Sequence, residues 1–578
     1  MADHGGNSRR SSRQGPRRPK TPQRNVTEKN KPKSTLSRNR GRQTPRDRNV
    51  IKAQSGVTSL PSDLWTLLLP FLTWRDTSAM RCVCSEWRQV LTEAKTLSPE
   101  WRATILGPSA NGADSLELLR TNHLKWADTR FAPDLVLLSA ASRDPCPWHS
   151  GGYWEEAIAG IEEAKLVPPT CKIICVLTMN AVLGREDEEV GEEGDSNTSA
   201  VTLSVSIAHL PETSLELAEF DRKDLRRYHR GVELENPFTS LGGEGAPSFL
   251  MFGVNDQSAA QLLPAIEEWY PRAAVVGGVS PLIDRCVPLA TYCGGLDSRQ
   301  DRKQRKNRSA QQQAYRRPRP RGKVAFPSTM LLRLHGKVGV RAFSSSGYHP
   351  ITPVLRCEST NVAEELTQVV AYDLVSLVGH ETSEEFAQLR IIDLLDPSER
   401  LAIEQEGRAL NIFACHESAP LEYLLNNCYG ATEMRLSEPD SVRIDRLEFV
   451  FWLQNGLVSL PGLCWQERAY GILASHHHTR TSQALKTILR SIREGLANDT
   501  ALGAFLVAGA LNEVEDQVHA KDVREHFTGV FQELDIGGCI VSTSIGPVAF
   551  PGGLQLPARR RALVQAHTTC GAIFYTKA

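Results

Sequence analysis

The sequence predicts an α+β or α/β fold, with a small helical unit ahead of two mixed-sheet halves that carry covering helices. Three observations predict it. A chain of 578 residues is too long for one hydrophobic core. Its composition, 40% apolar and 23% charged, is that of a globular protein. From about residue 130 onward, strand-length apolar runs alternate with runs of helical periodicity, the pattern of sheets covered by helices.

Short runs rich in β-branched and aromatic residues mark the expected strands. The tripeptide Gln454-Asn455-Gly456, between two of these runs, is typical of a hairpin turn. The runs are Asp134–Ser139, Lys172–Leu177, Val201–Ala208, Phe249–Val254, Ala273–Val276, Leu331–Leu334, Gly339–Phe343, Leu410–Ala414, Leu447–Trp452, Leu457–Leu460, Ala504–Val507, Cys539–Ser542 and Ala572–Tyr575.

Helical spacing of apolar residues predicts three further elements. The first is residues 361–374, where Asn361 is a candidate N-cap and Glu364 stands at the capping-box position. Leu485–Leu496 and Val523–Leu534 repeat apolar residues every three or four positions. We therefore expect a helix in each of these segments.

Three segments are too polar and too charged to form a packed core. Residues 1–55 are expected to be disordered, and positions 1–50 hold 15 Lys/Arg against three Asp/Glu. Two insertions, 185–199 and 297–324, are expected to be disordered loops, the first acidic and the second basic. The basic runs are typical of a solvated tail, and the alternatives are a nuclear address or contact with nucleic acid.

The thirteen cysteines have no regular spacing, and no C-x₂-C pair occurs. We therefore expect reduced thiols, no metal and no cofactor. The first 50 residues contain no apolar core of a signal peptide, and the longest apolar run, Ala501–Leu511, is about half a membrane span. These features predict an intracellular protein of the cytoplasm or nucleus, with no membrane association.

The segment LPSDLWTLLLPFLTWRDTSAMRCVCSEWRQVL, residues 60–91, is an apolar island after the polar tail. Leu64, Leu67, Leu68 and Phe71 form one helical stripe, which Pro70 should end near Leu69. A second helix is expected to start at Asp76-Thr77. Short helices cannot hide so many apolar side chains unaided, so the stripes pack either on the rest of this chain or on a partner.

The residue identities favour a partner, because the segment resembles the F-box. Leu60-Pro61-Ser62-Asp63-Leu64 opens the pattern and Val83-Cys84 with Trp87 closes it, whereas Pro70 is unusual within it. F-boxes bind the adaptor Skp1 and so join a cullin–RING ubiquitin ligase. The resemblance implies an F-box over residues 56–104. It implies an adaptor-binding set of Leu60, Pro61, Leu64, Leu68, Leu72, Val83 and Trp87.

A second, weaker resemblance covers about residues 125–578. The stretches APDLVLLSAAS, AAVVGGVS and VRAFSSSGYHPITPVLRC are similar to the N-terminal half of the FIST module (F-box and intracellular signal transduction). ALGAFLVAGALNEV, GGCIVSTSIGPVAF and ALVQAHTTCGAIFYT are similar to its C-terminal half. The resemblance implies an N-terminal half over residues 125–355 and a C-terminal half over 356–578.

The family's small-ligand elements are altered here. Residues 507–511 lack the family's Cys and Arg, and residues 543–546 lack its acidic residue. The remaining candidate pocket is the expected loop 344–350, which follows a strand and carries serines near a glycine, although a self-satisfied turn is the alternative. Gly277-Gly278 allow either backbone approach to a ligand or a turn. The candidate pocket residues are Ser346, Gly347, Tyr348, His349, Gly509 and Ser544.

No catalytic residue is expected. Cys415-His416 are neighbours in sequence, whereas a nucleophile and its base normally come from separate elements. His476–His478 precede an expected helix and are interpreted as an exposed turn. The resemblance implies a non-enzymatic substrate-recognition subunit of an SCF-type ubiquitin ligase, with Skp1 and a protein substrate as partners. The alternatives are a small-molecule sensor and a nucleic-acid-binding protein, the latter not favoured.

Overall fold

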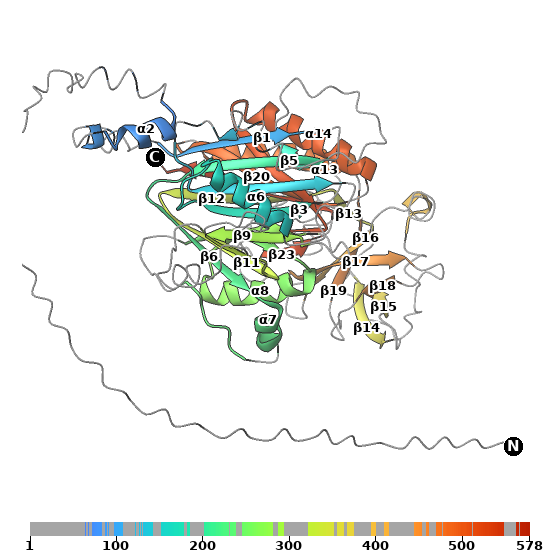
Figure 1. The fold of residues 1–578 in the computed structure, drawn as a ribbon. Coiled ribbons are helices and arrows are strands. Elements are labelled where there is room, and N and C mark those ends of the chain that lie inside the picture. Colours follow the sequence, from blue (N-terminus) through green and yellow to red (C-terminus); the bar gives the residue numbers. More distant parts are fainter. Residues whose placement is uncertain are drawn as a thin grey trace, which may run out of the picture. The chain divides into compact units, whose positions relative to one another are not determined.

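In a computed structural model of the chain, the described residues form four β-sheets with helices packed on them (Figure 1). The chain divides into two units, Met1–Leu60 and Pro61–Ala578, and every described residue belongs to the second. The structure describes residues 72–83, 87–89, 98–107, 126–127, 131–142, 152–178, 182–184, 201–229, 232–238, 246–280, 287–293, 322–351, 355–362, 367–374, 395–399, 410–415, 444–452, 458–461, 470–476, 478–496, 498–510, 513–547, 562–565 and 567–577, and the single residues Leu64, Leu68, Leu91, Leu119, Asn122, Thr129 and Leu401.

The first sheet has the strand order β1-β5-β2-β3-β9-β10. Its β2 and β3 are parallel and are connected through helix α6 (Gly152–Glu163), and its other pairs are antiparallel. Alternate residues of β3 face opposite sides: Ile173 and Cys175 pack with α6, and Ile174 packs on the other side. The strands are β1 (Glu100–Leu106), β5 (Val201–His209), β2 (Leu135–Ser142), β3 (Lys172–Thr178), β9 (Leu289–Cys293) and β10 (Lys323–Ala325).

The second sheet has the order β23-β22-β8-β7-β11-β6 and repeats this plan. Its parallel pair β7–β8 is connected through α8 (Asp256–Trp269), which starts at Asn255, whose side chain accepts the Ser258 amide. Helix α7 (Arg222–His229) packs on α8. The strands are β23 (Ala562–Gln565), β22 (Thr543–Pro547), β8 (Ala274–Val279), β7 (Ser248–Gly253), β11 (Thr329–Gly336) and β6 (Thr213–Phe220).

The third sheet has the order β12-β24-β20-β21-β4. Parallel β20 and β21 are connected through α14 (Glu513–Val530), which packs with α13 (His478–Gly495) on one face. Its strand β4 and the β22–β23 hairpin of the second sheet each pair with strands from the other side of residue 355. The strands are β12 (Val338–Ser346), β24 (Thr568–Thr576), β20 (Thr500–Gly509), β21 (Asp535–Val541) and β4 (Val182–Gly184).

The fourth sheet is antiparallel throughout. Six of its strands form a closed ring, because β19 pairs with β14 along one edge and with β16 along the other. The short strand β13 also pairs with β19. The strands are β13 (Tyr348–Pro350), β19 (Tyr470–His476), β14 (Leu355–Val362), β15 (Thr367–Leu374), β18 (Val458–Pro461), β17 (Ile444–Trp452) and β16 (Leu410–Cys415).

The central core lies where the inner faces of the first three sheets meet. Leu137, Phe252 and Phe505 come from one sheet each and belong to the same buried cluster. A Cβ atom on Gly278 would come within 2.6 Å of Val507 Cγ1, so glycine allows the second and third sheets to approach closely. Gly277-Gly278 lie inside β8, so they do not form a turn.

Every predicted strand overlaps a strand of the structure, and the helices predicted at Leu485–Leu496 and Val523–Leu534 overlap α13 and α14. Helix α14 begins earlier than predicted, at Glu513, and ends at Val530, before the predicted end at Leu534. The helix predicted over 361–374 is wrong, because β14 and β15 form an antiparallel hairpin there. The loop predicted over 344–350 is also wrong: Ser344–Ser346 end β12 and Tyr348–Pro350 form β13. The disordered segments predicted at 1–55 and 185–199, and residues 297–321 of the one predicted at 297–324, lie outside the described residues. The prediction is wrong for residues 323–324, which begin β10.

The N-terminal helices follow the predicted pattern with one shift. Leu64 and Leu68 are helical and Leu72 is not, as expected from a helix that ends around Pro70. Helix α2 (Trp74–Met80) starts at Thr73 rather than at the predicted Asp76-Thr77. Asp76 instead completes a capping box with Thr73 from the third helical position.

Candidate functional site

The apolar residues of the segment 64–91 divide between exposed and buried positions. Leu64 is 42% exposed, Leu68 is 40% exposed and Val83 is 64% exposed, whereas Leu91 is buried. Six large apolar side chains are exposed among the described residues, and three of them are Leu64, Leu68 and Val83. The other three are Val232, Phe326 and Leu401. Leu72 and Trp87 are half-buried, and Leu60 and Pro61 lie outside the described residues. We refer to Leu64, Leu68, Leu72, Val83 and Trp87 as the apolar face.

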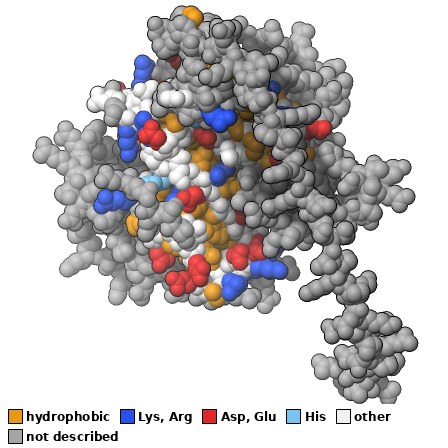
Figure 2. Space-filling model, turned by 60° about the vertical axis from the view of Figure 1, so that its left-hand side comes forward, with side chains coloured by type: hydrophobic (Ala, Val, Ile, Leu, Met, Phe, Trp, Pro, Cys, Tyr) orange, Lys and Arg blue, Asp and Glu red, His pale blue; other side chains and the backbone are white. Residues whose placement is uncertain are grey.

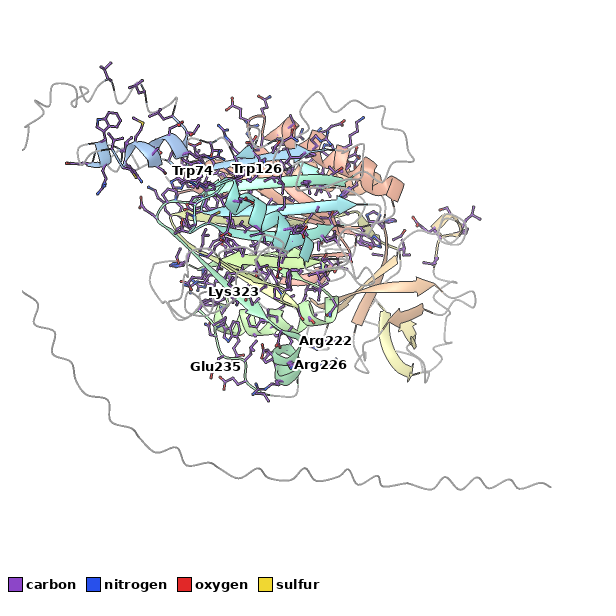
Figure 3. All side chains as sticks on the ribbon, viewed as in Figure 1. Trp74, Trp126, Arg222, Arg226, Glu235 and Lys323 are labelled. Carbon is purple, nitrogen blue, oxygen red and sulfur yellow. The ribbon has the colours of Figure 1, made fainter. Side chains whose placement is uncertain are left out.

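Polar contacts hold the helices of this segment in place. The amide of Asp76 donates to Thr73 Oγ1 over 3.2 Å, and the amide of Thr73 donates to Asp76 Oδ2 over 3.0 Å. The guanidinium of Arg81 donates to the carbonyl of Leu91 over 2.8 Å. The amide of Trp74, labelled in Figure 3, donates to the carbonyl of Thr129 over 3.0 Å. None of these contacts uses the side chains of Leu64, Leu68 or Val83, so they fix the backbone while these three side chains stay exposed.

A cluster of rings lies at the junction of the second, third and fourth sheets. Tyr348 on β13 and His476 on β19 are opposite each other in register, and their ring centroids are 5.2 Å apart. His567, between β23 and β24, has its ring centroid 5.8 Å from that of His476 and 6.5 Å from that of Tyr348. Tyr348 and His476 are buried. The prediction that His476 lies in an exposed turn is therefore wrong.

His567 has two unusual properties. Its backbone φ of 47° lies in the left-handed region, which is costly for a residue with a side chain. Its amide nitrogen lies so near Gly509 that a Cβ atom there would be 2.8 Å away. Burial lowers the pKa of the His567 imidazole to about 4, although its hydrogen bond with the Ala510 backbone partly opposes that shift. The ring is therefore neutral at physiological pH.

The fold brings most of the predicted pocket residues to this cluster. Ser346 is opposite Thr568 in register, and Ser544 Oγ donates to the Thr568 carbonyl over 2.7 Å. Ser346 is buried, and its Oγ has no hydrogen bond within the described residues. Gly347 separates β12 from β13. We call Ser346, Tyr348, His476, Gly509, Ser544 and His567 the histidine cluster.

His349 has a different partner: its Nε2 lies 3.1 Å from Glu399 Oε1. Cys570 contacts Ser344, with 3.2 Å between Sγ and Oγ. Burial raises the pKa of the Cys570 thiol to about 11. A thiol with such a pKa is a poor nucleophile. His416 lies outside the described residues, and the side chain of Cys415 is likewise not described.

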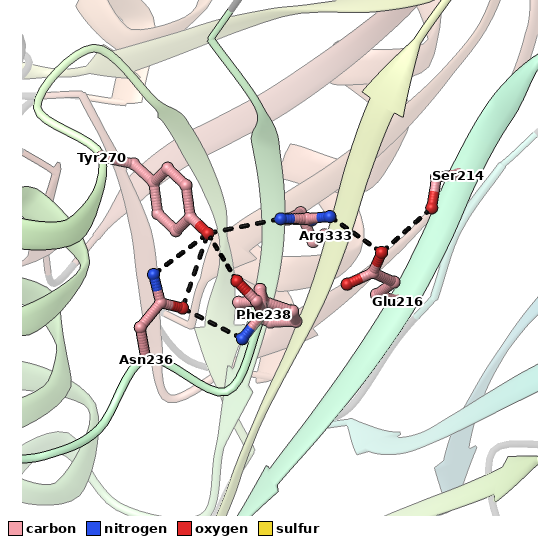
Figure 4. A network of polar contacts seen from close by, with 6 residues as sticks. All are labelled: Ser214, Glu216, Asn236, Phe238, Tyr270 and Arg333. Carbon is pink, nitrogen blue, oxygen red and sulfur yellow. Dashed lines mark hydrogen bonds and ion pairs between the residues drawn. The ribbon is translucent and has the colours of Figure 1, made fainter. Parts of the chain in front are cut away.

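A further polar network, absent from the sequence-based predictions, centres on buried Arg333 of β11 (Figure 4). Its Nη2 donates to Glu216 Oε1 over 2.8 Å, and its Nη1 donates to the Tyr270 hydroxyl over 3.3 Å. The Tyr270 hydroxyl also donates to the Phe238 carbonyl over 3.3 Å, and Asn236 Nδ2 donates to that hydroxyl over 3.1 Å. The network therefore holds the segment 232–238 against the second sheet.

Two kinds of site are not found within the described part of the chain. Its His, Cys, Asp and Glu side chains do not gather in groups of three that could hold a metal ion. No described helix is long and apolar enough to cross a membrane.

The comparisons with known proteins add little. No protein-family model matches the chain, and no curated protein matches it. Among solved structures it is similar to the structure of PurLQS from Thermotoga maritima, with 10% identity and a TM-score of 0.16. That match covers 83% of this chain and 72% of the other. A similarity this low carries no argument about fold or function.

Proposed function

We propose that the protein is the substrate-recognition subunit of an SCF-type ubiquitin ligase, which binds Skp1 through the apolar face. The proposal rests on the F-box-like pattern of residues 60–91 together with one observation. Leu64, Leu68 and Val83, three members of the implied adaptor-binding set, carry exposed apolar side chains. Apolar side chains gathered in one short segment of a surface are a common feature of protein-binding sites.

The energetics of docking follow from the exposure of the leucines. Complete burial of a leucine contributes about 1.5–3 kcal/mol. Leu64 and Leu68 are each about two-fifths exposed, so covering them contributes about 1 kcal/mol each. Because the capping box and the Arg81–Leu91 contact already order the backbone, docking has a smaller conformational entropy cost.

The chain needs no catalytic residue for this role. It would hold a bound protein near the ubiquitin thioester of a separate conjugating enzyme and so raise the effective concentration of the two reactants. The mixed sheets with their closely packed core would supply a rigid receptor, and the ubiquitinated protein would be degraded by the proteasome.

Co-purification with Skp1 tests the proposal. The double variant Leu64→Asp/Leu68→Asp replaces two exposed leucines, so the fold should survive. Two lost contacts of about 1 kcal/mol, with carboxylates placed in an apolar interface, predict a loss of affinity of about 30-fold or more. The matched control is Phe326→Asp/Leu401→Asp, at exposed apolar positions outside the face. Absence of Skp1 binding by the unaltered chain, or equal losses in both variants, would overturn the proposal.

We propose a small-molecule sensor as the second candidate function, because one observation favours it. The Ser346 hydroxyl is buried without a hydrogen bond in the described structure, and Ser346 is opposite Thr568, which follows His567 with its left-handed backbone. A polar metabolite that bound there would raise the melting temperature of the chain in a concentration-dependent way. A metabolite panel that produces no shift in the unaltered chain would exclude this function.

A further inference from the structure

Helix α7 is a short amphipathic helix with a well-defined start. Asp221 Oδ1 accepts the amides of Lys223 and Asp224, over 2.7 and 2.9 Å. These hydrogen bonds lower the pKa of the Asp221 carboxyl and cap the helix. Leu225 is buried against α8, and half-buried Tyr228 packs on the same cluster. The inner face of α7 is therefore anchored.

The outer face of α7 carries four exposed cations within six positions: Arg222, Lys223, Arg226 and Arg227. Figure 3 labels Arg222 and Arg226 on this helix. None of the four side chains forms an ion pair or a hydrogen bond with any described residue. Asp221 and Asp224 are also exposed on this segment, so its four cations and two carboxylates leave residues 221–227 with a net charge of +2. An anionic partner would be attracted to that excess.

An exposed apolar side chain adjoins the cations. The amide of Val232 donates to the carbonyl of Arg227 over 3.1 Å, which places this residue at the C-terminal end of α7. Val232 is 45% exposed. The segment that follows it is held to the second sheet by the Arg333 network, through Asn236 and Phe238. The patch of Arg222, Lys223, Arg226, Arg227 and Val232, the α7 patch, is thus presented by ordered backbone on both sides.

We propose that the α7 patch is a docking surface for a short acidic peptide segment that also carries an apolar residue, within the protein to be ubiquitinated. This inference rests on the proposed function for the origin of the peptide. The charge of the patch selects carboxylates, and Val232 offers a contact for one apolar side chain. The cations span about 8 Å along the helix axis, which matches two or three residues of an extended peptide.

The surroundings of the patch favour a peptide over nucleic acid. Glu233 and Glu235 are exposed on the segment after Val232, and Glu235 is labelled in Figure 3. Figure 2 shows acidic and basic side chains side by side at the lower edge of the described surface. The backbone of a nucleic acid carries evenly spaced phosphate charges, so some phosphates would lie near these carboxylates and be repelled by them. A short peptide places its charge only where the cations are.

The test uses the full chain and a fluorescein-labelled 12-residue peptide of Glu and Asp residues with two leucines, measured by fluorescence anisotropy in low salt. The variant Arg226→Glu/Arg227→Glu reverses two charges of the patch. Its matched control, Lys486→Glu/Arg490→Glu, reverses two exposed charges on α13. We expect the first to weaken binding at least tenfold and the control less than twofold. Peptide addition should also slow hydrogen exchange in residues 222–232.

Three outcomes would overturn the inference. The first is equal weakening in both variants, which would assign the binding to basic residues elsewhere in the chain. The second is a single-stranded DNA 12-mer that binds more tightly than the peptide and needs the same arginines. The third is unchanged exchange in residues 222–232. Skp1 co-purification of the same variants separates the two proposals, because Arg226→Glu/Arg227→Glu should retain Skp1. If the peptide binds α7 but Skp1 does not bind, the patch stands and the ligase function fails.

Discussion

The stability of the protein should depend on pH through His567. The folded-state pKa of its imidazole is about 4, against an ordinary value of 6.5. The folded state therefore excludes a proton that the unfolded chain binds between these two pH values. It follows that the contribution of His567 is fully present above pH 6.5 and is lost as the pH falls towards 4.

The size of the effect follows from the same two values. At about 1.4 kcal/mol for each tenfold difference in proton affinity, the interval from 6.5 to about 4 corresponds to about 3 kcal/mol. This is an upper limit, because His567 retains intermediate exposure and solvent screens part of the interaction. Protonation also places a cation beside the ring of His476.

The test is urea unfolding of the unaltered chain and of the His567→Asn variant at several pH values from 7.5 to 4. Asparagine tolerates a left-handed backbone and does not titrate. All other titrating groups are shared, so their effects cancel in the difference between the two chains. The free energy of unfolding of the unaltered chain should fall by up to about 3 kcal/mol more than that of the variant. A difference that stays constant over this range would refute the reasoning.

Three further substitutions test the packing by urea unfolding. Gly277→Ala should destabilise the chain by more than about 3 kcal/mol, because the new Cβ would lie 1.6 Å from the Met251 carbonyl oxygen, which cannot move without breaking the sheet; an unchanged midpoint would contradict this. Gly529→Ala should stabilise it by about 0.5–1 kcal/mol, because the position is in helix α14 with nothing within 4 Å; a loss of stability would count against that helix. Arg333→Met should lower the free energy of unfolding by about 1–3 kcal/mol, because Tyr270 and Glu216 each lose a hydrogen-bond partner. It should also speed proteolysis within residues 232–238, and unchanged proteolysis would show that other contacts hold that segment.

Sequence patterns located the elements whose apolar residues reflect local geometry. Strand β3 is apolar on both faces because α6 covers one side and the central core the other, so a continuous apolar run identified it. Helices α13 and α14 bury one face each and therefore show helical spacing. The segment 361–374 has apolar residues at both spacings, and the strand-favouring Val369, Val370 and Tyr372 prevailed in the structure.

The candidate sites also differ in whether local sequence spacing or long-range strand pairing brings their residues together. The exposed leucines Leu64 and Leu68 lie on a helix that could be predicted, because the spacing of apolar residues along one helix is local. Four members of the histidine cluster are among the predicted pocket residues, but His567 is not, since it reaches Tyr348 and His476 only through the pairing of strands that are distant in sequence. The loop predicted at Ser344–Ser346 failed for a related reason: polar serines read as a turn, but β24 pairs with them and buries them.

Hydrogen exchange of the full chain with and without purified Skp1 tests the central claim most directly. The claim is that the exposed side chains of Leu64, Leu68 and Val83 stay uncovered until an adaptor covers them. Addition of Skp1 should slow exchange within residues 60–91 in the unaltered chain, and should leave it unchanged in Leu64→Asp/Leu68→Asp. Exchange in residues 60–91 that is the same with and without Skp1, or protection by Skp1 confined to the sheets, would contradict the account.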